Sequence, residues 1–157
     1  MKQPISLESD FVDFLKLCNL NEVKYLVIGG YAVSIHGYPR STKDLDVLIQ
    51  MSEENAEKMK KVIDDFGFAS LKLTKEDFLK PDFVTQLGQE PIRIDILNDI
   101  DGLDYEEAWR NRRMVNYEGV QIPFIGYNEL LQIKAIAGRP QDLADISKLE
   151  KRNKKKK

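Results

Sequence analysis

At 157 residues, the chain is long enough for one hydrophobic core and too short for two, so we expect a single domain over residues 1–150. Its 42% apolar and 32% charged residues are typical of a globular protein, and no apolar run approaches the roughly 20 residues that span a bilayer. The N-terminus does not resemble a secretory signal, and the single cysteine, Cys18, cannot form an internal disulfide, so we expect a cytoplasmic protein without a membrane partner.

The formal net charge of −2 hides an uneven distribution of basic residues. Residues 151–157, KRNKKKK, hold six of the 24 Lys and Arg, which leaves 18 basic and 26 acidic residues and a net charge of −8 on the rest. Such an acidic body excludes a broad DNA-binding surface. A run of like charges at a terminus is usually solvated, so we expect 151–157 to be a disordered basic tail, with contact to nucleic acid as the alternative.

Apolar periodicity and turn residues predict alternating helices and strands in the first part of the chain. Four elements are expected before residue 50: a helix over 7–19, a strand over 25–28, a helix over 31–37 and a strand over 45–49. Ser52 is a good N-cap and is followed by two glutamates in the first turn, which predicts a helix to about Phe66.

The second part of the chain predicts antiparallel strands and then helices. The expected elements are a hairpin of strands over 83–87 and 92–97, a helix over 104–112, a hairpin over 114–124, and helices over 129–137 and 140–149, with Asn128 as a cap and Pro140 in the first turn of the last helix. This order favours an α+β fold in which helices pack on a mixed β-sheet.

Two glycines, Gly29 and Gly30, stand where the first predicted strand gives way to a helix. Glycine at such a bend lets backbone N–H groups approach a phosphate, and a helix N-terminus adds a favourable partial charge. Many strand-to-helix turns use glycine for geometry alone, so this pattern is weak by itself.

Asp44 and Asp46 stand two residues apart at the head of the second predicted strand, so both carboxylates point to the same face of the sheet. Two neighbouring carboxylates repel each other unless a positive charge lies between them. Mg²⁺ binds one or two carboxylates and completes its shell with water and substrate phosphates. The pair therefore indicates a divalent cation site.

Asp95 is the third candidate acid. In the predicted strand 92–97, isoleucines face one side, while Arg93, Asp95 and Leu97 face the other. An acid at the centre of an apolar strand is unexpected for a solvent-exposed residue without a specific role. If this strand lies beside Asp44 and Asp46, three carboxylates could hold two metal ions about 4 Å apart and stabilise an in-line phosphoryl displacement.

These features together resemble the nucleotidyltransferase superfamily related to polymerase beta: two glycines after an apolar strand, Asp-Leu-Asp thirteen residues later, and an acid in a later strand. The segment 29–49, GGYAVSIHGYPRSTKDLDVLI, is similar to the bacterial branch that contains AbiEii-type toxins and uncharacterised relatives. The segment 122–149 is similar to that branch too, since a helix with a lysine precedes Arg-Pro-x-Asp-x-x-Asp. The resemblance covers residues 22–150 and implies a nucleotidyltransferase fold.

The resemblance also implies roles for single residues. It assigns metal binding to Asp44, Asp46 and Asp95, the last also as an aid to deprotonating the acceptor. It places Gly29 and Gly30 in the phosphate loop, although the commoner Gly-Ser would supply a hydroxyl that this chain lacks. The remaining matches are Lys134, which would meet the terminal phosphates, and an accessory acidic pair, Asp142 and Asp145.

Other polar residues allow a functional and a structural interpretation. Arg40 and Lys43 flank the first acids and could contact phosphate, or they could lie on a solvated turn. His36 has no partner histidine or cysteine, which favours a hydrogen-bonded structural role over contact with a nucleotide. Arg139 is interpreted as a charge that favours a helix C-terminus, and Asp145 could instead pair with a lysine.

We therefore expect a Mg²⁺-dependent enzyme, with two ions and with Mn²⁺ as a substitute, that transfers a nucleoside monophosphate from a nucleoside triphosphate to an acceptor hydroxyl and releases pyrophosphate. The acceptor would be RNA such as tRNA, a protein or a small molecule. The alternative is a non-catalytic relative that binds nucleotide or a partner, such as one half of a toxin–antitoxin pair. A metal-dependent phosphodiesterase is a third hypothesis, since an acid cluster does not distinguish transfer from hydrolysis.

Overall fold

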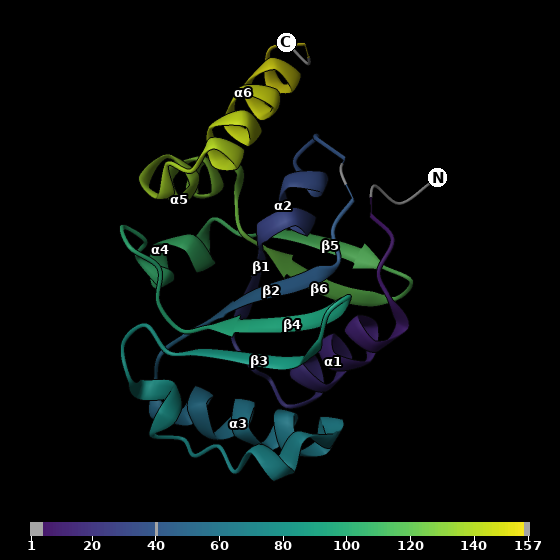
Figure 1. Cartoon of the computed structure of the whole chain (residues 1–157), viewed down its shortest axis with the longest axis vertical. Coiled ribbons are helices and arrows are strands. Elements are labelled where there is room, and N and C mark those ends of the chain that lie inside the picture. The colour runs from purple at the N-terminus through teal and green to yellow at the C-terminus, as the bar shows by residue number, and fades with distance from the viewer. Residues whose placement is uncertain (1–4, 40, 156–157) are drawn as a thin grey trace.

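A mixed β-sheet forms the centre of the computed structural model, which describes residues 5–39 and 41–155 (Figure 1). Within those residues, six strands occur in the order β3-β4-β2-β1-β6-β5. Their bounds are β1 Tyr25–Ile28, β2 Asp44–Ile49, β3 Val84–Gln89, β4 Ile92–Leu97, β5 Arg113–Tyr117 and β6 Val120–Phe124. The pairs β2–β4 and β1–β6 are parallel, and the other three pairs are antiparallel.

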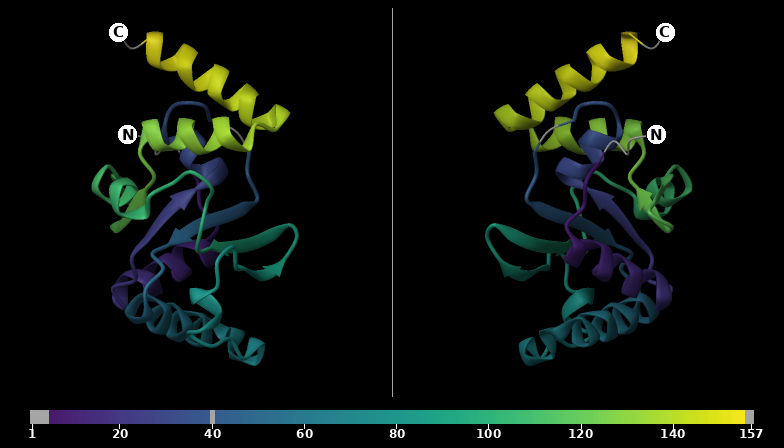
Figure 2. Two further views of the ribbon diagram at one scale, coloured as in Figure 1. Left: turned by 90° about the vertical axis from the view of Figure 1, so that its left-hand side faces the viewer. Right: turned by 90° about the vertical axis from the view of Figure 1, so that its right-hand side faces the viewer.

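Helices lie on both sides of this sheet. Their bounds are α1 Ser9–Leu20, α2 Gly29–Ile35, α3 Glu53–Ile63, α4 Tyr105–Arg110, α5 Tyr127–Ala137 and α6 Pro140–Lys155. Helices α1 and α3 lie on one side of the sheet and α2, α5 and α6 on the other (Figures 1 and 2). In the part of the chain that the structure describes, none of the helices has both the length and the apolar composition to cross a membrane.

The hydrophobic core lies on both sides of the sheet and includes residues of α1 and α3 on one side and of α2, α5 and α6 on the other. Strand β1, at the centre of the sheet, is buried along its whole length. Helix α1 buries its apolar face, including Phe11, Phe14 and Cys18, each with 0% exposure. The free thiol of Cys18 is therefore a structural group, as predicted, and burial raises its pKa well above the ordinary value.

The predicted α+β class is confirmed, while several element boundaries differ from prediction. Helix α2 begins at Gly29, two residues early, and α5 is capped by Gly126 rather than by Asn128. Helix α3 continues into a π-helical turn over Asp64–Phe68, and short 3₁₀ turns follow at Ala69–Leu71 and Asp77–Leu79, where no element was predicted. Except for the isolated turn at Asp77–Leu79, these deviations fall at helix ends, where hydrogen-bonding patterns change within one turn.

The prediction of disorder from residue 151 is wrong for residues 151–155, because helix α6 continues through Lys155. Lysine, arginine and glutamate are good helix formers, and cations in the last turn interact favourably with the helix dipole. A run of lysines that directly extends an established helix therefore prolongs it. The last two residues, 156 and 157, lie outside the described residues.

Candidate functional site

The three predicted acids meet at the junction of β2 and β4. These strands are parallel, with Asp46 paired to Asp95 and Asp44 paired to Arg93. Parallel pairing places the side chains of paired residues on the same face of the sheet, and Asp44 shares that face with Asp46 because they are two residues apart. The fold thus brings two stretches 49 residues apart into one group of carboxylates.

Arg93 lies among these carboxylates and was not predicted as a site residue. Its Nε donates to Asp95 Oδ1 at 2.8 Å, and its Nη2 donates to Asp95 Oδ2 at 3.1 Å and to Asp44 Oδ2 at 3.3 Å. A further ion pair of 3.0 Å joins its Nη1 to Glu90 Oε1. The signal in the sequence was its position two residues before Asp95, which puts both side chains on one face of β4.

Burial and mutual repulsion make ionisation of two of these carboxyls unfavourable. Burial, followed by the charges of Asp95 and Asp44, raises the pKa of Asp46 to about 7. Burial also raises the pKa of Asp44, although Arg93 acts in the opposite direction. In addition, Asp44 Oδ1 is buried and has no hydrogen-bond partner among the described residues. Additional positive charge would therefore stabilise the ionised forms of these carboxylates.

The two glycines of the β1–α2 bend pack closely against β2 and the residues just before it. Gly29 has a positive φ of 72°, and a Cβ at this position would overlap Asp46 Oδ2. A Cβ on Gly30 would lie only 2.8 Å from Thr42 Oγ1. Gly29 thus brings its backbone directly against the carboxylate group, which gives this glycine a structural reason independent of any ligand.

A cavity of about 380 Å³ opens beside these groups. Its polar wall contains Gly29, Asp46, Asp95, Lys134, Arg139 and Asp142. Its apolar lining residues include Ile28, Val84, Leu97, Ile100, Leu130 and Ile133. A larger hollow of about 880 Å³ lies between α1, α4 and β6, but none of the predicted site residues that the structure describes lines it.

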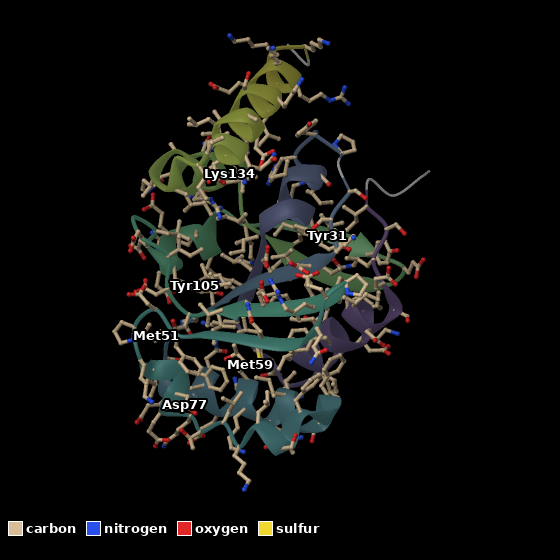
Figure 3. All side chains as sticks on the ribbon, in the orientation of Figure 1. Tyr31, Met51, Met59, Asp77, Tyr105 and Lys134 are labelled. Atoms are coloured by element: carbon tan, nitrogen blue, oxygen red, sulfur yellow. The ribbon has the colours of Figure 1, made fainter. Side chains whose placement is uncertain are left out.

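Helices α5 and α6 contribute a buried ion cluster to this cavity. Lys134, labelled in Figure 3, is only 7% exposed, and its Nζ lies 2.9 Å from Asp145 Oδ2 and 3.3 Å from Asp142 Oδ1. Both acids are buried, Asp145 completely. Burial raises the pKa of Asp142, but hydrogen bonds from Arg139 and Lys134 outweigh it and hold that pKa below its usual value. The predicted lysine and acidic pair therefore contact one another.

The other predicted residues lie apart from this cavity or outside the described residues. Lys43 is exposed and does not line it, and Arg40 belongs to the residues that the structure does not describe. The interpretation of His36 as a structural histidine is supported, because its Nε2 lies 2.7 Å from the carbonyl oxygen of Ile125.

The carboxylate group suits a divalent cation by its chemistry, although the side chains are not arranged around one. Three carboxylates, of which Asp44 and Asp46 have a raised pKa, a buried oxygen without a hydrogen-bond partner and an adjacent cavity form a donor set of the kind that Mg²⁺ takes. Among the described residues, however, no cluster of three or more histidine, cysteine, aspartate and glutamate side chains has the geometry of a metal site. Arg93, bonded to Asp44 and Asp95, supplies positive charge at this position.

Solved structures with the same fold include several nucleotidyltransferases. A candidate nucleotidyltransferase from Thermotoga maritima aligns with a TM-score of 0.60 and 17% identity over 88% of each chain. The lincomycin-bound lincosamide antibiotic adenylyltransferase LnuA aligns at 0.57 and 18% identity, over 92% of this chain and 96% of that one. ANT(2")-Ia in complex with adenylyl-2"-tobramycin aligns at 0.54 and 10% identity, over 88% and 84%. At these identities the likeness establishes the fold.

Comparison with curated proteins found no match. A family model described as nucleotidyl transferase of unknown function (DUF2204) matches residues 9–157, which supports the predicted resemblance to nucleotidyltransferases. The narrower resemblance to the AbiEii-type toxin branch stays a prediction. Since this match spans nearly the whole chain, the protein belongs to that family of nucleotidyl transferases.

Proposed function

We propose that the protein uses Mg²⁺ to transfer a nucleoside monophosphate from a nucleoside triphosphate to an acceptor hydroxyl, with release of pyrophosphate. The observation that carries this proposal is the parallel register of β2 and β4, in which Asp46 pairs with Asp95 and shares a face with Asp44. We retain from the sequence a single domain and a cytoplasmic location, where nucleoside triphosphates and Mg²⁺ are abundant.

In this proposal, Asp44, Asp46 and Asp95 hold the divalent cations, and Arg93 gives up its bonds to Asp44 and Asp95 when they bind. Mg²⁺, or Mn²⁺ in its place, would lower the pKa of the attacking hydroxyl and neutralise charge on the triphosphate. Asp95 accepts the proton of the acceptor hydroxyl. The contribution of the chain is thus to orient the two substrates and to supply the carboxylate oxygens that would hold the cations beside the reacting phosphate.

The proposed nucleotide contacts surround the same carboxylates. The backbone N–H groups of Gly29 and Gly30 lie at the bend that packs against Asp46, which supports a close approach of phosphate. Lys134 lines the cavity and lowers the cost of bringing an anion there. Arg40 and Lys43 are proposed as outer contacts that attract the triphosphate, and Asp142 and Asp145 as accessory acids that hold Lys134.

The test is transfer of label from each of four α-labelled nucleoside triphosphates, with Mg²⁺ or Mn²⁺, to acceptors of three classes. These are total RNA including tRNA, cell protein, and a library of small molecules with hydroxyl groups such as aminoglycosides and lincosamides, which are suggested by the two antibiotic-bound structures. We expect a labelled acceptor in one class and its loss in Asp46→Asn. Full activity of Asp46→Asn would refute the mechanism.

A second candidate function is nucleotide or partner binding without catalysis, as in one component of a toxin–antitoxin pair. It is favoured by the four ion-pair and hydrogen-bond contacts that hold Arg93 to Asp44, Asp95 and Glu90, because a guanidinium that stays in place supplies part of the positive charge that a metal ion would otherwise bring. Isothermal calorimetry with Mg²⁺ and ATP separates the two. Binding that disappears in Asp44→Ala supports the enzyme, whereas nucleotide binding that is indifferent to Mg²⁺ and to this substitution supports the second function.

A further inference from the structure

The cavity beside the carboxylates contains one cation whose side chain is largely exposed. Arg139 stands in the two-residue connection between α5 and α6, and its side chain is 75% exposed. Lys134 lines the same cavity, but it is 7% exposed and its ammonium group contacts two buried carboxylates. An anion that enters the cavity therefore meets the guanidinium of Arg139 before the ammonium of Lys134.

Asp142 fixes the direction of this guanidinium. Arg139 Nε donates to Asp142 Oδ2 at 2.6 Å, and Nη2 donates to Asp142 Oδ1 at 3.2 Å, a bidentate contact. The backbone N–H of Arg139 also donates to Asp142 Oδ2 at 3.2 Å. Arg139 thus occupies the cap of α6, and the acid three residues later reaches back to it, as in a capping box.

This arrangement leaves part of the guanidinium available. Arginine has five N–H donors, and the contacts to Asp142 engage the Nε and one Nη2 hydrogen. Across residues 5–39 and 41–155, no partner is found for Nη1. The remaining donors form a planar edge beside a cavity that also contains Asp46 and Asp95. A rigid, charged donor edge of this kind matches two oxygens of a phosphate.

We propose that Arg139 directly binds the phosphates of the nucleoside triphosphate, and that Asp142 is a positioning residue that acts through it. Asp142 orients the guanidinium, and Lys134 ties Asp142 and Asp145 together so that α5 and α6 keep their relative position. This inference rests on the proposed function for the identity of the ligand. It assigns Arg139 a role different from that of a charge that merely stabilises a helix C-terminus.

The test is equilibrium binding of inorganic tripolyphosphate, ATP and adenosine to wild type and variants, without and with Mg²⁺. We expect Arg139→Gln to weaken binding of both polyphosphates about 10- to 100-fold, because a charge-assisted contact is lost, and to change adenosine binding by less than about twofold. Arg139→Lys should recover only part of the loss, since lysine keeps the charge but not the fork. Arg110→Gln, at an exposed arginine of α4, is the matched control.

The positioning role of Asp142 is tested by a double-mutant cycle on tripolyphosphate affinity. Asp142→Asn should weaken binding, and adding Arg139→Gln to it should produce little further loss, since both act on one contact. Unchanged circular dichroism and adenosine binding exclude a general loss of structure.

The outcomes separate this inference from the proposed function. Tripolyphosphate binding that depends on Arg139, in a protein without transfer activity, supports the inference and refutes the function. Transfer activity that depends on Asp46, with unchanged polyphosphate affinity in Arg139→Gln, refutes the inference alone. A wild-type protein that binds neither tripolyphosphate nor ATP refutes both.

Discussion

Replacement of Asp46 by asparagine is expected to stabilise the metal-free protein, and to do so more at pH 8 than at pH 5. Burial and the neighbouring Asp95 and Asp44 raise the pKa of Asp46 from 3.8 to about 7 in the folded protein. Between these two values the unfolded chain ionises at this position while the folded protein does not. Ionisation therefore favours unfolding as pH rises from about 4 to about 7, and the penalty is constant above that range.

The size of the effect follows from these two pKa values. The penalty is about 1.6 kcal/mol at pH 5 and about 4 kcal/mol at pH 8, where both states are ionised. Asparagine has nearly the same shape and does not titrate, so it removes the penalty. Because residual interactions in the unfolded chain reduce such differences, we expect the gain in unfolding free energy to grow by about 1–3 kcal/mol from pH 5 to pH 8.

Urea denaturation in the presence of a chelator, at both pH values, measures this gain. Asp13→Asn, at an exposed acid of α1, controls for the loss of one charge. In saturating Mg²⁺, wild type should have a higher unfolding free energy than Asp46→Asn, because Mg²⁺ binding stabilises wild type more than a variant that lacks one metal ligand. An equal gain at pH 5 and pH 8, or a larger one at pH 5, would show that Asp46 is not held in an environment that opposes its ionisation.

Two further substitutions test the packing and charge balance around the site, and a third tests a buried hydrogen-bond network elsewhere in the fold. Gly29→Ala should lower the unfolding free energy by at least about 2 kcal/mol more than Gly119→Ala does. Both glycines have a positive φ, but only a Cβ at Gly29 would meet Asp46. Equal losses of unfolding free energy in urea denaturation would contradict this contact. In the presence of a chelator, Arg93→Met should lower the unfolding free energy by about 1–3 kcal/mol, because the neighbouring carboxylates lose their cation. Mg²⁺ should then raise the melting temperature of this variant more than that of wild type. A variant as stable as wild type in chelator would argue against this role of Arg93. Asn55→Ala should lower the unfolding free energy by about 2–4 kcal/mol, because this buried side chain makes three hydrogen bonds that join α3 to Lys24 and Gln50. Asn116→Ala, at an exposed residue of β5 whose side chain accepts one hydrogen bond from Gly119, should cost less than about 1 kcal/mol by thermal denaturation.

Much of the site could be predicted because its parts are encoded locally. The alternation of β4 put Asp95 on the face opposite the buried Ile94 and Ile96, and the structure agrees. The two-residue spacing put Asp44 and Asp46 on one face. Both patterns depend only on the two-residue period of a strand and can therefore be predicted from the sequence.

Arg93 shows where local interpretation was incomplete. Its place on the same face as Asp95 was evident from alternation, but whether it reaches Asp44 depends on the pairing of β4 with β2. Arg139 is a similar case, because its helix context suggested a dipole contact, whereas the packing of α5 against α6 places it over the cavity with Asp46 and Asp95. The charged groups that a residue contacts from distant parts of the chain cannot be predicted from its own segment.

The sequence by itself determined the strands and most helices, the bend at Gly29 and Gly30, and the faces on which Asp44, Asp46 and Asp95 lie, because periodicity and turn chemistry act over a few neighbouring residues. Only the tertiary structure decided that β2 and β4 pair in parallel, that Asp46 lies opposite Asp95, and that the α5–α6 connection borders the same cavity. The physical reason is that strand partners and helix positions are selected by burial of apolar surface from the whole chain, which no single segment specifies.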